Sequence, residues 1–192
     1  MWGELVAQTF LKPREAARRV LAAGFPPGVV AEAALAVTSL GIVLGYLALR
    51  VAHGVPADPV SAALLARPLV GVLVQLAALL LVAWLTATLG RRFGGRGDLL
   101  GAATAIVWLN AATLVVQVLQ LVALVLAPPL AAALAMVTLV WLLWAFACFV
   151  AELHGFASPA IVLGVVVLVG VSLVFLLTFI AALAGLTPQG TP

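Results

Sequence analysis

Residues 69–90 read LVGVLVQLAALLLVAWLTATLG, a run of 22 positions without a charged side chain. A transmembrane helix needs about 20 apolar residues to cross roughly 30 Å of hydrocarbon. Because backbone groups in lipid must bond within their own segment, such a run predicts an α-helix. Further apolar runs lie at residues 29–51, which holds Glu32 and Arg50 near its ends, and at 99–127, 130–151 and 160–184, which hold no charged side chain. The sequence therefore predicts an all-α membrane protein, a bundle of five transmembrane helices.

The composition agrees with these runs and excludes the soluble protein classes. Apolar residues make up 66% of the 192 positions and charged residues 8%, with a mean hydropathy of +1.34. Soluble domains carry roughly 25% charged residues. The net charge of +3 is concentrated in short segments beside the spans. Anionic lipid headgroups explain that charge better than nucleic acid, so we expect lipids as partners and no nucleic acid.

Lysine and arginine counts predict the orientation. Seven basic residues lie on one side of the predicted spans and two on the other. Basic residues gather on the cytoplasmic side, so the N-terminus is expected inside and the 185–192 tail in the periplasm. An Arg- and Ala-rich composition suggests a bacterial inner membrane. The seven are Lys12, Arg14, Arg18, Arg19, Arg91, Arg92 and Arg96; the two are Arg50 and Arg67.

The N-terminal segment, residues 1–28, is expected to be an amphipathic helix in the membrane interface. It mixes charges among its apolar residues, unlike a signal peptide. Its basic side chains, Lys12, Arg14, Arg18 and Arg19, are predicted to contact lipid headgroups, with Glu15 and Arg19 paired one turn apart. The apolar positions that define the first part are Trp2, Leu5, Val6 and Phe10.

The ends of the runs carry helix start and stop signals. Asp98 can cap the third run, and Ser158 with Pro159 supplies an N-cap and a first-turn proline for the fifth. Two prolines at 128–129 separate the third run from the fourth. Residues 58–67 are predicted to form a short helix between the first two runs.

The third run carries a stripe of polar side chains at spacings of three and four. Such a stripe lies on one helical face, and that face should point into the bundle. One hypothesis is polar contact between helices. The other is the lining of a solute path or a lipid-headgroup groove, which intramembrane polar residues often mark. The stripe consists of Asn110, Thr113, Gln117 and Gln120.

A second group of polar residues is expected at the cytoplasmic ends of the spans. Glu32 and Glu152 lie near the ends of the first and fourth runs, and His154 follows two residues later. We predict an interfacial charge cluster in which Arg91, Arg92 or Arg96 pairs with a carboxylate; a proton-sensitive role for His154 is the alternative. One histidine and one carboxylate are too few for a zinc site, so no metal is expected.

Other motifs give no indication of catalysis. There is no G-x-S-x-G elbow, no H-E-x-x-H and no P-loop, and the lone Cys148 can form neither an intramolecular disulfide nor a thiolate cluster. The glycine-rich segment 92–97 lacks the strand context of a nucleotide site and is interpreted as a flexible, lipid-facing turn. Gly41 and Gly45 form a G-x-x-x-G pair, which favours close helix packing within the chain, with packing across a dimer as the alternative. We expect no cofactor and no enzymatic activity.

Three short segments and the five spans together resemble the Yip family, the Ypt-interacting-protein domain of five-pass membrane proteins. The segments are Lys12-Pro13-Arg14-Glu15-Ala16, Gly94-Gly95-Arg96-Gly97 and residues 152–156. In eukaryotes that family is implicated in vesicle trafficking and membrane shaping, whereas many bacterial relatives lack an assigned activity, so the resemblance implies a membrane protein of unsettled role. The segment before the first span, residues 1–28, lacks the Tyr-Gly-Pro signature of eukaryotic members, so small-GTPase binding is not carried over.

Two functional hypotheses follow. The first is a non-enzymatic protein that organises or shapes membrane, with a membrane-protein partner or a second copy as possible contacts. The second is a small transporter, channel or lipid-translocating protein that uses the polar stripe of the third span.

Overall fold

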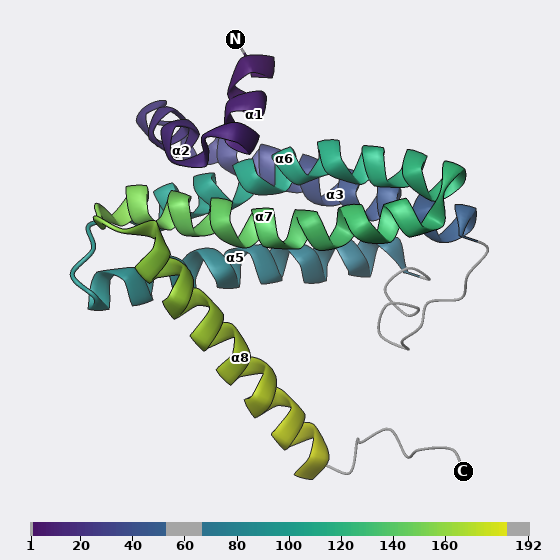
Figure 1. The fold of residues 1–192 in the computed structure, drawn as a ribbon. Helices are drawn as coiled ribbons and strands as arrows, with labels where there is room; N and C mark the ends of the chain where they lie inside the picture. Colours follow the sequence, from purple (N-terminus) through teal and green to yellow (C-terminus); the bar gives the residue numbers. More distant parts are fainter. Residues whose placement is uncertain (1, 53–66, 184–192) are drawn as a thin grey trace.

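The computed structural model describes residues 2–52 and 67–183 and contains only helices within those ranges. Figure 1 shows α3, α5, α6 and α7 lying side by side, with α8 leaving this group at an angle and α1 and α2 on one side of it. The helices are α1 (Trp2–Leu11), α2 (Pro13–Ala22), α3 (Pro27–Val51), α5 (Pro68–Arg92), α6 (Leu99–Leu126), α7 (Pro128–His154) and α8 (Pro159–Leu183).

Five of these helices, α3 and α5 to α8, are long and apolar enough to cross a membrane, as the sequence predicts. Their observed bounds lie within three residues of the predicted runs: α3, α5, α7 and α8 begin one or two residues earlier, α5 and α7 end two or three residues later, and α6 ends one residue earlier. A proline begins four of the five, where its missing N–H costs no hydrogen bond. The predicted 58–67 helix, apart from Arg67, and the 185–192 tail lie outside the described residues.

The predicted caps are also present. The Asp98 carboxylate accepts a hydrogen bond from the Gly101 N–H at 2.9 Å, and α8 begins at Pro159 directly after Ser158. The C-terminal end of α7 is capped by Gly155, which adopts φ 75°. Glycine takes this left-handed conformation without steric cost, and it commonly ends a helix.

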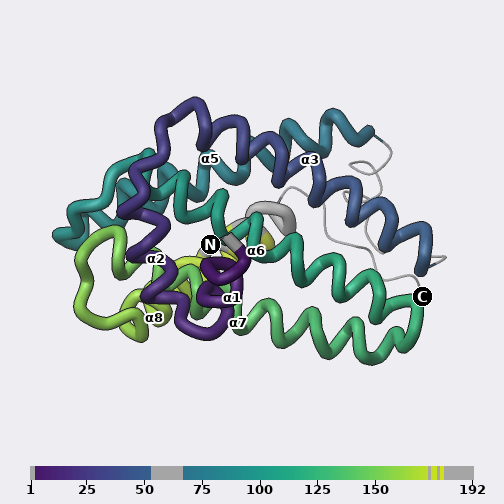
Figure 2. The backbone as a smooth tube through the Cα atoms, turned by 90° about the horizontal axis from the view of Figure 1, so that it is seen from above, coloured from purple at the N-terminus to yellow at the C-terminus, as the bar shows by residue number. Residues whose placement is uncertain are grey.

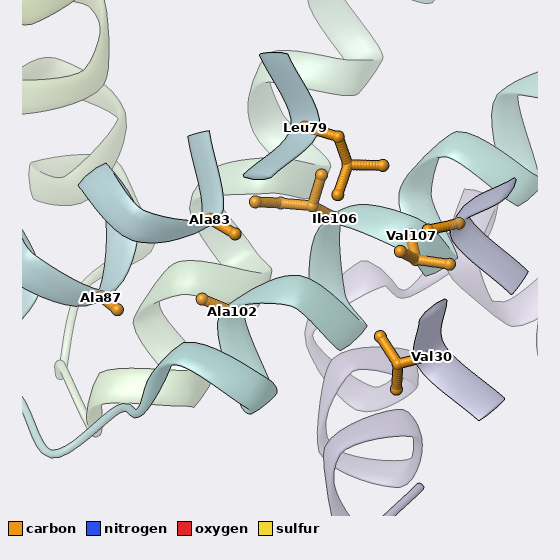
Figure 3. Close-up of a cluster of buried hydrophobic side chains, with 8 residues drawn as sticks. Val30, Leu79, Ala83, Ala87, Ala102, Ile106 and Val107 are labelled. Carbon is orange, nitrogen blue, oxygen red and sulfur yellow. The ribbon is translucent and has the colours of Figure 1, made fainter. Parts of the chain in front are cut away.

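Small side chains let the long helices approach closely. Ala83 and Ala87 of α5 face Ala102 of α6, while Leu79 and Ile106 fill the adjacent layer (Figure 3). Without a hydrophobic driving force in lipid, such close van der Waals packing is a main source of helix association.

The N-terminal segment forms two short helices instead of one. Lys12 leaves the helical conformation (φ −141°, ψ 65°) because the residue before a proline is restricted, and the chain turns there. Figures 1 and 2 show both short helices crosswise to the long ones. α2 buries Ala17 and Val20 against Ala105 of α6 and Phe149 of α7. We call this end of the bundle, which also holds the α5–α6 and α7–α8 turns, the α2 end.

Candidate functional site

Two arginines of α2 converge on Glu152 at the end of α7. Its Oε1 accepts a hydrogen bond from Arg18 Nε at 2.9 Å and its Oε2 one from Arg14 Nε at 3.2 Å. The two arginines are four residues apart on α2, so both reach the same carboxylate. The Glu152 side chain is only 19% exposed, which strengthens the pairing relative to a fully solvated one. The hydrogen bond to Glu152 and its charge raise the pKa of Arg18.

Arg14 also ties α2 to the turn that leads into α8. Its terminal nitrogens donate to the carbonyl oxygens of Ala157 at 3.1 Å and Phe156 at 3.4 Å. One guanidinium therefore connects α2, the last turn of α7 and the first residues before α8.

These contacts correct the predicted ion pairs. Glu152 pairs with α2 and not with Arg91, Arg92 or Arg96, because α2 folds back onto α7 and brings two guanidiniums within reach. Arg91 instead donates to the Ala87 carbonyl of its own helix at 3.1 Å. The side chains of Arg91, Arg92 and Arg96 are exposed at the α2 end. Glu32 is exposed on α3, and among the described residues no ion pair joins it to this cluster.

The predicted pair between Glu15 and Arg19 is likewise replaced. Glu15 lies 3.5 Å from Lys12 Nζ and accepts a hydrogen bond from Gln8 Nε2 at 3.0 Å. The turn between α1 and α2 places these groups beside Glu15, whereas the Arg19 side chain is exposed. Of the four basic residues expected at lipid headgroups, Arg14 and Arg18 are held by Glu152, and Lys12 and Arg19 remain at the surface.

His154 is buried beside this charge cluster, with 2% of its surface exposed. Its Nδ1 accepts a hydrogen bond from the Gly97 N–H at 3.1 Å, and its Nε2 lies 3.2 Å from the Thr86 carbonyl oxygen. A carbonyl can only accept, so these two bonds together require the neutral ring with its proton on Nε2. The His154 carbonyl accepts from the Arg96 N–H at 3.3 Å, and the ring stacks on Phe156.

Three glycines give the imidazole its space. A Cβ at Gly90 or Gly95 would collide with the His154 ring, and one at Gly97 would lie 2.7 Å from its Cε1 and 2.6 Å from Leu153 Cγ. We call His154 with Gly90, Gly95 and Gly97 the histidine cage. The 92–97 segment is therefore a packed, hydrogen-bonded turn, not the flexible lipid-facing turn expected from its glycines.

The histidine cage was missed in the sequence because its members are 57 or more residues apart from His154. The sequence signal that could have indicated it is the recurrence of glycine at 90, 95 and 97 around a turn. These glycines leave room for one large side chain from elsewhere in the chain, here that of His154. Glycines at such spacing mark close approach as well as flexibility.

The polar stripe of α6 makes mostly local bonds. Asn110 Nδ2 donates to the Ile106 carbonyl at 2.8 Å, and Thr113 Oγ1 donates to the Asn110 carbonyl at 2.7 Å. Gln120 Nε2 donates to Thr138 Oγ1 of α7 at 3.3 Å, which links the two helices. The Oε1 of Gln117 is buried with no partner among the described residues.

The glycine pair of α3 has unequal surroundings. A Cβ at Gly41 would lie 3.7 Å from Leu114 and 3.9 Å from Gln117 of α6, whereas one at Gly45 would meet nothing within 4 Å. Gly41 therefore packs within the chain, and Gly45 faces open space.

No metal-binding arrangement is evident in residues 2–52 and 67–183. Within those ranges, no three His, Cys, Asp or Glu side chains lie close enough to hold a metal ion. The groups brought together at the α2 end can bind charge and fix helix positions.

Comparison with known proteins gives the family. The Yip1 domain matches residues 7–181, which include four spans in full and α8 up to residue 181, together with the α1–α2 turn, the histidine cage and Glu152. No curated protein and no solved structure matched the chain. With five membrane-spanning helices and a match over most of its length, the chain belongs to the Yip1 domain family.

Proposed function

We propose that this chain is a non-enzymatic membrane protein that organises or shapes the bilayer by inserting α1 and α2 into one leaflet. The observation that carries the proposal is how far from the ends of α6 and α7 the two short helices make their contacts, since this distance gives their depth relative to the membrane surface. The basic residues of the α2 end and the Yip1 family membership support it.

The long helices exceed the thickness of the hydrocarbon. α6 has 28 residues and α7 has 27. At 1.5 Å per residue they are about 42 and 40 Å long, roughly 10 Å more than the hydrocarbon. No charged residue lies between Asp98 and Glu152, so the α6–α7 turn at the far end is uncharged. Charged residues are expensive in lipid, so we assign the excess length to the α2 end.

This assignment places α2 at the membrane surface. α2 contacts Ala105, six residues from the start of α6, and Phe149, five residues from the end of α7. These positions lie about 8 to 9 Å from the helix ends, which is close to the surface of the hydrocarbon. Exposed Lys12 and Arg19 then lie at the level of lipid headgroups, where Arg19 attracts anionic lipid by about 1 kcal/mol and Lys12 by less, because Glu15 offsets part of its charge.

α1 lies deeper. Thr9 Oγ1 accepts a hydrogen bond from Trp108 Nε1 at 3.0 Å, and Phe10 stacks on Trp141 at 4.5 Å between ring centroids. These partners are about 14 and 20 Å from the ends of α6 and α7, which puts α1 roughly 4 to 10 Å below the hydrocarbon surface. Interfacial helices are typically buried by a similar depth. Because α1 runs crosswise to the bundle (Figure 1), it takes up area in one leaflet alone.

The hydrogen bonds of α6 support packing more than transport for the polar stripe. Asn110 and Thr113 use their own helix, and Gln120 is bonded to α7. Our proposal further places the protein in a bacterial inner membrane with α1 on the cytoplasmic side, on the distribution of basic residues. Contact with a membrane-protein partner or a second copy is compatible with the same role.

The test measures depth and membrane shape on the full chain. In a Cys148→Ala background, Ala7→Cys on α1 and Ala22→Cys on α2 each carry an environment-sensitive fluorophore; both side chains are exposed. We expect acyl-chain quenchers to act more strongly at position 7 and headgroup quenchers at position 22. Equal quenching of both labels by an aqueous quencher refutes the proposal.

The shaping arm uses vesicles that contain anionic lipid. Wild-type protein at high density is expected to produce narrower vesicles or tubules in electron micrographs. Ala7→Asp adds a second carboxylate to α1, which already carries the exposed Glu4 near its start, and should weaken this effect, whereas the matched variant Ala22→Asp should retain it. Vesicles that keep their size with the wild-type protein contradict membrane shaping.

A further inference from the structure

A lateral groove opens between α8 and the rest of the bundle. Its volume is about 600 Å³, and its walls come from α5, α7 and α8. Along α5 the lining runs from Val82 to Phe93, and along α8 from Ser158 to Gly170, with Phe146 and Val150 of α7 between them. Figure 1 shows the cause: α8 diverges from α5 and α7 as it leaves the α2 end.

The groove has the length of one leaflet. From Val82 to Phe93 the α5 wall extends 11 residues, or about 17 Å. Half of the hydrocarbon thickness is about 15 Å. Because α5, α7 and α8 are membrane-spanning helices whose excess length lies at the α2 end, the mouth of this groove is at the level of the headgroups. The rest of the groove faces the hydrocarbon, and its open side admits lipid.

The length and the lateral opening of the groove suit an acyl chain as the occupant. A helix is about 10 Å or more across. An acyl chain is several times narrower and can follow the whole groove. The volume is also within the range of ordinary small-ligand sites, roughly 300–1,000 Å³.

The mouth of the groove carries excess positive charge. On one side, Ala157 lines the groove and its carbonyl is bound by Arg14. Arg14 and Arg18 together face a single carboxylate, Glu152. On the other side, Arg92 is exposed and directly precedes Phe93 of the lining. An anionic phosphate at this mouth therefore gains favourable charge contacts, and arginine suits phosphate binding.

We propose that the groove between α5, α7 and α8 binds one acyl chain of an anionic phospholipid, with the headgroup phosphate at the Arg14 and Arg92 mouth. The site is separate from α1 and does not depend on membrane shaping. The lipid enters this site from the leaflet on the α2 side. Once bound, its acyl chain fills the space between α8 and the rest of the bundle.

The experiment uses the full chain in liposomes that contain phosphatidylglycerol or phosphatidylcholine, each with a photoreactive group on an acyl chain. Peptides labelled on irradiation are mapped by mass spectrometry. We expect the label to be concentrated on residues 82–93 and 156–170. Phosphatidylglycerol should give about fivefold more label there than phosphatidylcholine, because one added charge contact at the membrane surface contributes about 1 kcal/mol. Arg92→Gln should reduce that ratio towards one.

The matched variants place a tryptophan inside or outside the groove. Val165 lines it and is 38% exposed, whereas Val167 on the same helix is 44% exposed and is not part of the lining. Val165→Trp should lower the groove label by at least several-fold and Val167→Trp should not. Val82→Trp fills the groove from the α5 wall and guards against a folding defect specific to α8.

Three outcomes overturn the proposal. The first is label spread evenly over the exposed faces of all five spans; the second is label unaffected by both groove-filling variants. The third is a disulfide-linked dimer formed in membranes by Val165→Cys in the Cys148→Ala background, since a second copy would then occupy the groove. Equal labelling by the two lipids rejects the anionic headgroup. Vesicle shape should be unchanged in Val165→Trp, which separates this test from that of the proposed function.

Discussion

Replacing Gly90 by alanine tests whether the histidine cage holds the α2 end together. The added Cβ would overlap the His154 ring, whose Nδ1 and Nε2 are both fixed by hydrogen bonds to Gly97 and Thr86. The ring is almost fully buried and has no free direction in which to move. The substitution should therefore either shift α5 from α7 or expel the imidazole.

The magnitude follows from three contributions. Overpacking a tight site costs about 1–3 kcal/mol. Loss of the two ring hydrogen bonds costs about 1 kcal/mol each. Alanine regains up to about 1 kcal/mol over glycine within a helix. The net loss is about 3 kcal/mol, equivalent to a fall in Tm of roughly 6–12 °C for a chain of this length.

The assay is thermal unfolding in detergent, with Gly45→Ala as the matched control. A Cβ at Gly45 of α3 meets nothing within 4 Å, so this second glycine-to-alanine change in a long helix should be neutral or slightly stabilising. Adding His154→Ala to Gly90→Ala should restore part of the loss, because the colliding ring is removed and the two effects are coupled. If both glycine variants melt at the same temperature, the reasoning on the cage is refuted.

Three further outcomes follow from the structure. Glu152→Gln removes the charge shared by Arg14 and Arg18, so amide hydrogen exchange in α2 should rise several-fold while exchange in α6 stays unchanged; unaltered exchange in α2 would show that apolar packing alone holds it. Replacing Asn110 and Gln117 together by leucine should change stability by only about 1–2 kcal/mol and leave membrane shaping intact; loss of solute or lipid flux in a folded double variant would instead support transport. Reporter fusions at the two ends of the chain should report opposite sides of the membrane, because the number of spans is odd. If both report the same side, the chain crosses the membrane an even number of times and the assignment of five spans is wrong.

The sequence was sufficient for the spans because hydrocarbon imposes one local rule on every residue. A run such as 69–90 must be helical and must cross the membrane wherever its neighbours lie. The caps at Asp98 and before Pro159 are local in the same sense, since a side chain or ring acts on the backbone of its own first turn. The family resemblance drew on segments with the same local character and was confirmed over residues 7–181.

The candidate site depends instead on contacts between distant parts of the chain. Glu152 lies 138 residues from Arg14, and nothing local indicates that α2 folds back onto α7 rather than leaving Arg91, Arg92 or Arg96 as the partners. The four-residue spacing of Glu15 and Arg19 allowed a pair that the turn at Lys12 replaced.

Hydropathy and helix caps, set residue by residue by the surrounding solvent and the backbone, determined the number, type and limits of the membrane helices from the sequence alone. Tertiary structure decided which polar groups meet. Gly97 reaches His154 only because α5 and α7 pack closely enough to exclude a Cβ, and the groove exists only because α8 diverges from them. Both depend on the angles between helices, and every residue of each interface contributes to those angles at once.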